Sequence, residues 1–181
     1  MPGPDAIEHN APMTESAPPA EVEAVLRQFY TCEFTTVNRQ GQPLTWPSVP
    51  YFDPARGTIT CAVSIAFAAK AYNARRHPQV SLLFSDPTGS QLVDPPAVLI
   101  QGEAEVAEVL DYTPAIIGLF KTVSRRQPES RRFTGNRIVR RLFIWYLFQR
   151  LSLTVIPRRI LYWPKGDFDR VPTEIEMADA V

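Results

Sequence analysis

The first element that the hydrophobic pattern predicts is an amphipathic helix over residues 20–30, AEVEAVLRQFY. Four apolar residues recur there at the i, i+3, i+4, i+7 spacing of a single helix face: Val22, Val25, Leu26 and Phe29. Two prolines precede the segment, as is typical of a helix N-terminus. Residues 1–19 are rich in proline, alanine and acidic side chains, which predicts a disordered N-terminal tail.

After this helix the pattern changes to β-branched and aromatic residues, punctuated by the turn sequences NRQGQP and DPARG at hairpin spacing. This stretch predicts three antiparallel strands, at about 33–38, 44–52 and 58–64. Further along, QVSLLFSD and AVLIQGEAEVAEV predict two more strands, with Gly102 as a bulge or a point of close backbone approach. The alternating segment SLTVIPRRILYW predicts one or two closing strands.

Helical patterns interrupt the strands twice. A short helix is predicted over about 67–76, ending before Pro78 because the residue that precedes a proline disfavours the helical conformation. A longer, broken helical pattern predicts an insertion over 112–150. Short strands at regular spacing with helices inserted late predict a mainly β (α+β) fold, a small β-barrel with helical additions.

The length of 181 residues suits one domain with a sizeable core. We expect that domain over 20–170, followed by a C-terminal tail at 171–181. The formal net charge is zero, so the overall charge names no partner. Residues 121–170, however, contain 13 Lys and Arg against three acidic residues, an asymmetry that can mark an anion-binding face.

Several classes of enzyme are disfavoured by missing motifs. Cys32 and Cys61 are the only cysteines; their spacing is not that of metal ligands, and we expect ordinary buried side chains in a reducing cytoplasm. The sequence contains no HExxH, CxxC, GxSxG, GxGxxG or phosphate-loop motif, and we expect no bound metal. No signal peptide is recognisable. An enzyme with so few acid–base groups would take its chemistry from an organic cofactor.

The strongest candidate for such a site begins where a strand meets the short helix. Ser64 ends the strand, Lys70 lies in the first helical turn and Asn73 one turn further on, with Arg75 or Arg76 as additional cations. Phosphate groups bind where hydroxyl or N–H donors lie beside a cation. The alternative is that these residues form only the solvated face of a connecting helix.

The order of motifs resembles the pyridoxamine 5′-phosphate oxidase-like superfamily, the FMN-binding split barrels. The matching segments, in chain order, are TTVNRQGQPLTWPSVPYFD, GTITCAVS, KAYNARRHPQVSLLFSD, AVLIQGEAEV and LTVIPRRILYWPKGD. The first four cover most of residues 31–110 and the last covers 153–167. Each motif is loose, but five in the right order are fairly specific.

The resemblance implies a split β-barrel, usually a homodimer with the cofactor in a groove between subunits. It assigns phosphate binding to Lys70 and, through the end of the preceding strand, to Ser64; Arg76 is a candidate for further charge. The helix asparagine of the family matches Asn73. The strand that lies against the cofactor ring matches Thr45, Trp46, Pro47 and Ser48, although Trp46 fits a core position equally well.

This chain also departs from the vitamin B6 oxidases within the superfamily. Its second strand, LTWPSVPYFD, lacks their arginine and lysine, and Ala69 stands where they carry an arginine. The resemblance is therefore greater to the actinobacterial branch that uses FMN or the deazaflavin coenzyme F420. It implies hydride transfer between one of these cofactors and a small conjugated substrate. The alternative is a split-barrel protein that binds a flavin or deazaflavin without catalysis, or binds no cofactor.

The basic segment allows three interpretations. It is a solvated helical face, or an electrostatic funnel for an anionic ligand, or a helix that lies on a membrane surface beside LFIWYLF. The oligoglutamate tail of coenzyme F420 would suit a funnel built from Arg125, Arg126, Arg131 and Arg132. Nucleic-acid binding is disfavoured, because the aromatic residues are not interleaved with the basic ones.

Overall fold

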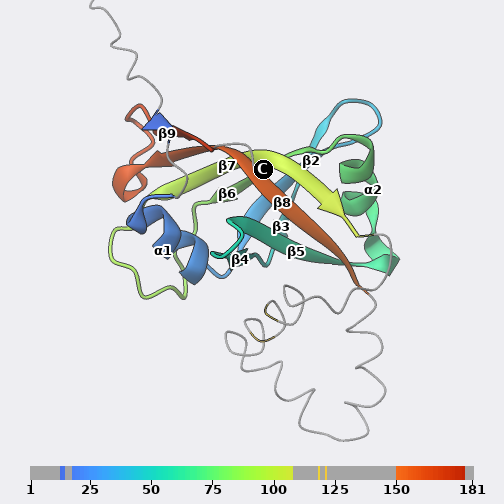
Figure 1. The fold of residues 1–181 in the computed structure, drawn as a ribbon, viewed down its shortest axis with the longest axis horizontal. Coiled ribbons are helices and arrows are strands. Elements are labelled where there is room, and N and C mark those ends of the chain that lie inside the picture. Colours follow the sequence, from blue (N-terminus) through green and yellow to red (C-terminus); the bar gives the residue numbers. More distant parts are fainter. Residues whose placement is uncertain (1–12, 15–17, 108–117, 119–120, 122–149, 178–181) are drawn as a thin grey trace, which may run out of the picture.

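The structure is a computed structural model that describes residues 13–14, 18–107, 118, 121 and 150–177 (Figure 1). The described part is a strongly curled, almost entirely antiparallel sheet, with an α-helix near each end of it. The predicted mainly β fold is thus confirmed. The insertion predicted over 112–150 lies almost entirely outside the described residues, as does most of the predicted N-terminal tail.

The described strands are β1 (Met13–Thr14), β2 (Cys32–Val37), β3 (Pro43–Ser48), β4 (Tyr51–Asp53), β5 (Thr58–Ser64), β6 (Gln79–Phe84), β7 (Ala97–Val106), β8 (Arg150–Trp163) and β9 (Thr173–Glu176). The helices are α1 (Ala20–Gln28) and α2 (Ala69–Arg76), with short 3-10 turns at Ile65–Phe67 and Pro164–Gly166. The helix predicted over 20–30 and the strands around both turn sequences are therefore present. Gly41 and Gly57 take positive φ angles in those two turns, which glycine tolerates without strain.

The strands follow one another in the order β4, β5, β8, β7, β6, β2, β3, with β9 on the second half of β8 and β1 beside β9. β3 and β4, at the two ends of this path, are consecutive in sequence and are joined through Val49 and Pro50. The sheet therefore curls until its ends meet, although no pairing between β3 and β4 occurs among the described residues. This geometry is an incompletely closed barrel.

The single strand predicted over 44–52 is divided in two, which corrects the sequence-based expectation. β3 pairs with β2, whereas β4 pairs with β5 on the other side of the opening. Pro47 and Pro50 lack the N–H group that a continuous ladder needs. The chain changes partners where these donors are missing.

The first half of the C-terminal segment, expected as a tail from residue 171, contributes strand β9. Ile175 is 2% exposed and pairs with Ile160 of β8. The sequence TEIE contains a single apolar residue, which is too weak an alternating pattern to predict a strand. Ile175 becomes buried only because this segment pairs with the distant strand β8.

The core is formed by residues from Val22 to Ile175, spread along the described chain. α1 buries the predicted apolar face, and Phe29 packs against Phe84 with 6.5 Å between ring centroids. Cys32 and Cys61 are both buried, as predicted. Within the described part of the chain, no helix has the length and apolar character needed to cross a membrane.

Gly102 lies at a close approach between β7 and β8, at the predicted bulge. The register between the two strands shifts between Gln101 and Gly102, and an added Cβ would overlap the carbonyl oxygen of Ile156. We expect Gly102→Ala to lower the free energy of unfolding by about 2–4 kcal/mol, because the two longest strands would have to separate. Urea denaturation measures the loss.

Gly41→Ala is the matched control for this substitution. An added Cβ at Gly41 meets no atom within 4 Å, so only its positive φ is strained. We expect a loss of about 1 kcal/mol there. Equal losses for the two variants would show that the contact with Ile156 is unimportant.

Candidate functional site

Helix α2 presents two polar side chains to the sheet. Its buried residues are Lys70, Ala71, Asn73 and Ala74. The two alanines let the helix backbone approach the sheet, so that the longer lysine and asparagine reach between the strands. Pro78 lies just beyond the C-cap residue His77, where the helix ends as predicted.

Lys70 is 9% exposed and its amine lies between α2, β2 and β3. Nζ donates a hydrogen bond to Ser48 Oγ over 2.5 Å. It also lies 5.3 Å from the centroid of the Phe34 ring and 5.8 Å from that of Trp46. A hydroxyl and two aromatic rings thus surround a cation on the inner side of the sheet.

No carboxylate compensates the charge of Lys70 among the described residues. Burial lowers the pKa of Lys70, because the charged form loses its hydration; the nearby Cys61 and Cys32 oppose this effect. A hydrogen bond with Cys61, together with burial, raises the pKa of Cys32 well above its ordinary value. That thiol therefore stays protonated and supplies no counter-charge.

Asn73 acts one helical turn later as a fixed contact between α2 and β2. Its Nδ2 donates to Thr36 Oγ1 over 3.1 Å, and both residues are buried. This bond holds the helix in place beneath Lys70. The asparagine assigned to the cofactor by resemblance thus has a structural partner in the sheet.

We expect Thr36→Val to lower the free energy of unfolding by about 1–2 kcal/mol, since it leaves the Asn73 amide without its acceptor while keeping the side-chain volume. Thermal unfolding measures this loss. Thr45→Val, at an exposed threonine on neighbouring β3, is the control and should cost less than about 0.5 kcal/mol. Similar losses at both positions would contradict the role given to the buried bond.

The four residues predicted on β3 do not form one surface. Trp46 and Ser48 lie on the side of Lys70, opposite Phe34 and Cys32 of β2. Thr45 and Pro47 alternate to the outer face, where Thr45 Oγ1 is 2.8 Å from Thr35 Oγ1. The structure therefore brings Trp46 and Ser48 to Lys70 but not Thr45 or Pro47.

The two remaining candidates lie at the ends of their elements. Ser64 is half-buried at the end of β5, in register with Arg150 of β8. Arg76 is exposed in the last turn of α2, beside Arg75, whose guanidinium donates to the carbonyl oxygen of Ala107 over 2.8 Å. Neither is an anion, so neither can compensate the charge of Lys70.

The comparisons with known proteins add information at the level of fold. No family model matches the sequence, and no curated protein is significantly similar to it. A conserved hypothetical protein of Mycobacterium tuberculosis has a TM-score of 0.58 at 18% identity, with 93% of this chain and 98% of that chain covered.

Two further similar solved structures are of proteins that are named for an activity. A Listeria innocua protein described as a pyridoxamine 5′-phosphate oxidase has a TM-score of 0.52 at 19% identity, with 78% of this chain and 94% of that chain covered. An F420 reductase has a TM-score of 0.52 at 17% identity, with 82% and 98% covered. The chain shares the split-barrel fold of these solved structures. At these identities the likeness establishes the fold alone.

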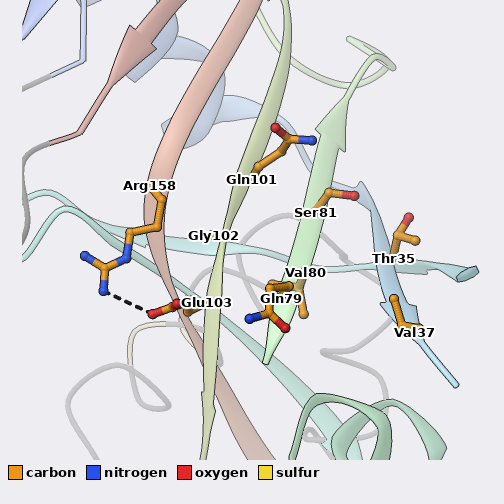
Figure 2. Close-up of a pocket in the computed structure, with 9 residues that line it drawn as sticks. All are labelled: Thr35, Val37, Gln79, Val80, Ser81, Gln101, Gly102, Glu103 and Arg158. Atoms are coloured by element: carbon orange, nitrogen blue, oxygen red, sulfur yellow. Dashed lines mark hydrogen bonds and ion pairs between the residues drawn. The ribbon is translucent and has the colours of Figure 1, made fainter. Parts of the chain in front are cut away.

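The split barrel also has a groove of about 390 Å³ on its outer face (Figure 2). It is lined by Thr35, Val37, Gln79, Val80, Ser81, Gln101, Gly102, Glu103 and Arg158. Thr35, Ser81 and Gln101 follow one another in register across β2, β6 and β7. Arg158 closes one end of the groove through an ion pair of 3.0 Å with Glu103. Most of the exposed lining surface is apolar, and the two charged residues of the groove are paired with each other.

Three residues near Lys70 were not predicted to belong to the site: Phe34, Cys32 and Cys61. Phe34 and Cys32 could have been found, because the predicted hairpin places them opposite Trp46 and Ser48. Cys61 could not, because it lies on β5, a strand that does not pair with β2. Its proximity to Lys70 arises from the curvature of the barrel.

Proposed function

We propose that this chain is a homodimeric, cytoplasmic oxidoreductase that binds FMN or coenzyme F420 and transfers a hydride between the cofactor and a small conjugated substrate. The observation that carries the proposal is the buried amine of Lys70, which has no carboxylate partner among the described residues. A buried cation is costly unless it is paired, and a phosphate would provide the missing charge.

The residues around Lys70 fit a phosphate ester. Lys70 offers a charge-assisted donor and Ser48 offers a hydroxyl at 2.5 Å from Nζ. Trp46 is half-exposed on edge strand β3, where its ring can border a planar group. The cofactor, when bound, supplies the hydride chemistry; the chain supplies the charge, the hydroxyl and an aromatic wall.

The homodimer is proposed because the split-barrel site is open on one side. β3 pairs only with β2 among the described strands, and its residue Leu44 is 39% exposed on the side of Lys70. A second copy placed along this edge would enclose a bound cofactor. Sedimentation velocity should therefore give the mass of two chains.

A fluorescence titration of the purified protein with FMN, coenzyme F420 and riboflavin tests the proposal. Riboflavin carries the FMN ring without its phosphate and is the matched control. We expect saturable tryptophan quenching by FMN or F420, and binding of riboflavin at least about tenfold weaker. If neither phosphorylated cofactor binds, the proposed function is wrong.

A second candidate is a non-catalytic flavin- or deazaflavin-binding protein. It is favoured by the chemistry of the groups near Lys70 among the described residues: a hydroxyl, two thiols and two aromatic rings. None of these is a ready general acid or base at neutral pH. Reduced cofactor bound to the protein should be reoxidised rapidly by an added quinone if the chain is an enzyme, and slowly if it only binds the cofactor.

A further inference from the structure

The groove on the outer face of the sheet (Figure 2) is separate from the surroundings of Lys70. The ring of Phe34 lies on the side of Lys70, whereas the next residue of β2, Thr35, lines the groove. Successive residues of a strand face opposite sides of the sheet, so the sheet itself lies between the two places. A volume of about 390 Å³ is within the range of small-molecule sites. The groove is therefore a candidate for a ligand that the proposed cofactor does not explain.

A β-bulge brings a charged pair to one end of the groove. On β8, Arg159 is in register with Gln101, and the next pair along β7 skips Arg158. Arg158 is therefore an extra residue that interrupts the alternation of β8. Its guanidinium contacts Glu103 and that of Arg159 contacts Gln101, two residues on the same face of β7. Bulges that re-aim a side chain in this way are common beside functional sites.

The charged pair is exposed enough to receive a ligand. Arg158 Nη2 donates to Glu103 Oε2 over 3.0 Å, and the two side chains are 38% and 45% exposed. An ion pair with this exposure contributes little to stability. A guanidinium fork carries several N–H donors and a carboxylate has a second oxygen, so each partner can bind a further group. Together the two residues offer donors for an anion and an acceptor for a cation, side by side.

The balance of charge selects the kind of ligand. Among the residues that line the groove, Glu103 and Arg158 are the two that carry a charge, so its formal net charge is zero. A ligand with a single charge would attract one partner and repel the other. A ligand with an ammonium and a carboxylate close together pairs with both at once. In an α-amino acid both groups are attached to one carbon, which matches two partners that are 3.0 Å apart.

We propose that the groove binds a free α-amino acid with an apolar side chain. The carboxylate of the ligand pairs with Arg158 and its ammonium with Glu103. Most of the exposed lining surface is apolar, and Val37 of β2 lies across the groove from Arg158, so the side chain of the ligand extends from β8 toward β2. This inference goes beyond the proposed function and does not depend on it.

Isothermal titration calorimetry of the full-length protein with L-leucine tests the proposal. Two matched probes each lack one charged group: isocaproate has no ammonium, and isoamylamine has no carboxylate. We expect L-leucine to bind with a dissociation constant below about 1 mM, and each probe to bind at least about tenfold more weakly. Equal binding of the three compounds, or no saturable heat with L-leucine up to about 10 mM, would overturn the proposal. The wild-type protein decides this without any variant.

A substitution in the charged pair locates the bound amino acid. Glu103→Gln keeps the shape of the side chain but removes its charge, so we expect it to weaken L-leucine binding by about tenfold or more. Arg170→Met is the matched control, because Arg170 forms an ion pair of 2.8 Å with Asp167 outside the groove, and it should leave the affinity unchanged. Equal affinities of the wild type and Glu103→Gln would place the ligand elsewhere and overturn the proposal.

Sedimentation velocity of the same variant distinguishes a ligand site from a subunit interface. If Glu103→Gln lowers the mass of the assembly, a second copy of the chain covers the groove and the proposal is wrong; an unchanged mass supports a ligand site. Binding of FMN or F420 should be the same in Glu103→Gln and the wild type, because Lys70 lies on the other side of the sheet. The proposed function and this inference therefore fail separately.

Discussion

Lys70→Met is expected to abolish binding of the phosphorylated cofactor while stabilising the cofactor-free protein. Loss of a charge-assisted partner in a buried site lowers affinity by about 100-fold or more. The methionine fills a similar volume without a buried charge, so the free energy of unfolding should rise by about 1 kcal/mol and the melting temperature by about 3 °C. Function and stability then change in opposite directions.

The pH dependence of this stabilisation has a definite sign. The pKa of Lys70 is lowered in the folded protein, so the unfolded chain binds more protons between that value and the ordinary 10.5. The free energy of unfolding of the wild-type protein therefore increases as the pH rises through this range. The extra stability of Lys70→Met over the wild type should shrink over the same range. Thermal unfolding at neutral and alkaline pH measures the difference.

Arg76→Met is the matched control, because it removes an exposed cation from the same helix. We expect its melting temperature to stay within about 1–2 °C of the wild-type value and its cofactor affinity to fall less than that of Lys70→Met. If Lys70→Met destabilises the protein instead, the amine has a stabilising partner, and the interpretation of Lys70 as an uncompensated cation is wrong.

Cofactor affinity should depend on pH as a bell-shaped curve, and Lys70→Arg should remove its alkaline side. For FMN, whose phosphate is a monoester, the second charge is gained near pH 6, which strengthens binding on the acidic side; for coenzyme F420, whose phosphate is a diester, we expect only the alkaline side of the curve. On the alkaline side, binding weakens as Lys70 loses its proton, by about tenfold for each pH unit above its pKa. Arginine stays protonated throughout this range.

Two thiols are the titratable groups that face Lys70 among the described residues. Cys32 lies on β2 and Cys61 on β5, and Glu33 is a charged neighbour of Cys32. The double substitution Cys32→Ser with Cys61→Ser should keep the alkaline decline in affinity, because the lysine remains. Titration with FMN or F420 from pH 5 to pH 10 compares the variants. A decline that persists in Lys70→Arg would assign it to a group other than the lysine.

Local patterns were sufficient to predict most of the secondary structure and the class of fold. The spacing of Val22, Val25 and Leu26 defines the buried face of α1. The two turn sequences define their hairpins because glycine alone takes the required φ at low cost. The bulge at Gly102 could also be predicted, since a glycine inside a strand marks a close approach. Each of these signals depends on neighbours within a few residues.

The composition of the candidate site was predictable only in part. Lys70 was identified from its position after a strand, and Trp46 and Ser48 from the resemblance of β3 to a ring-binding strand. Strand alternation predicts that the side chains of β3 divide between two faces of the sheet. It does not predict which of these faces lies against α2. Asn73 was assigned to the cofactor by resemblance, and its bond to Thr36, 37 residues earlier in the chain, could not be predicted from local sequence.

By itself, the sequence determined most of the strands, the two short helices and the one lysine beside a strand end, but neither β9 nor the division between β3 and β4. The tertiary structure decided that this lysine is buried, that Ser48 and the rings of Phe34 and Trp46 surround it, and that β9 completes the sheet. The physical reason is the range of the interactions. The side-chain period of a helix or strand and the φ preferences of turn residues act over a few residues, whereas burial and charge compensation depend on which distant strands the curvature of the sheet brings together.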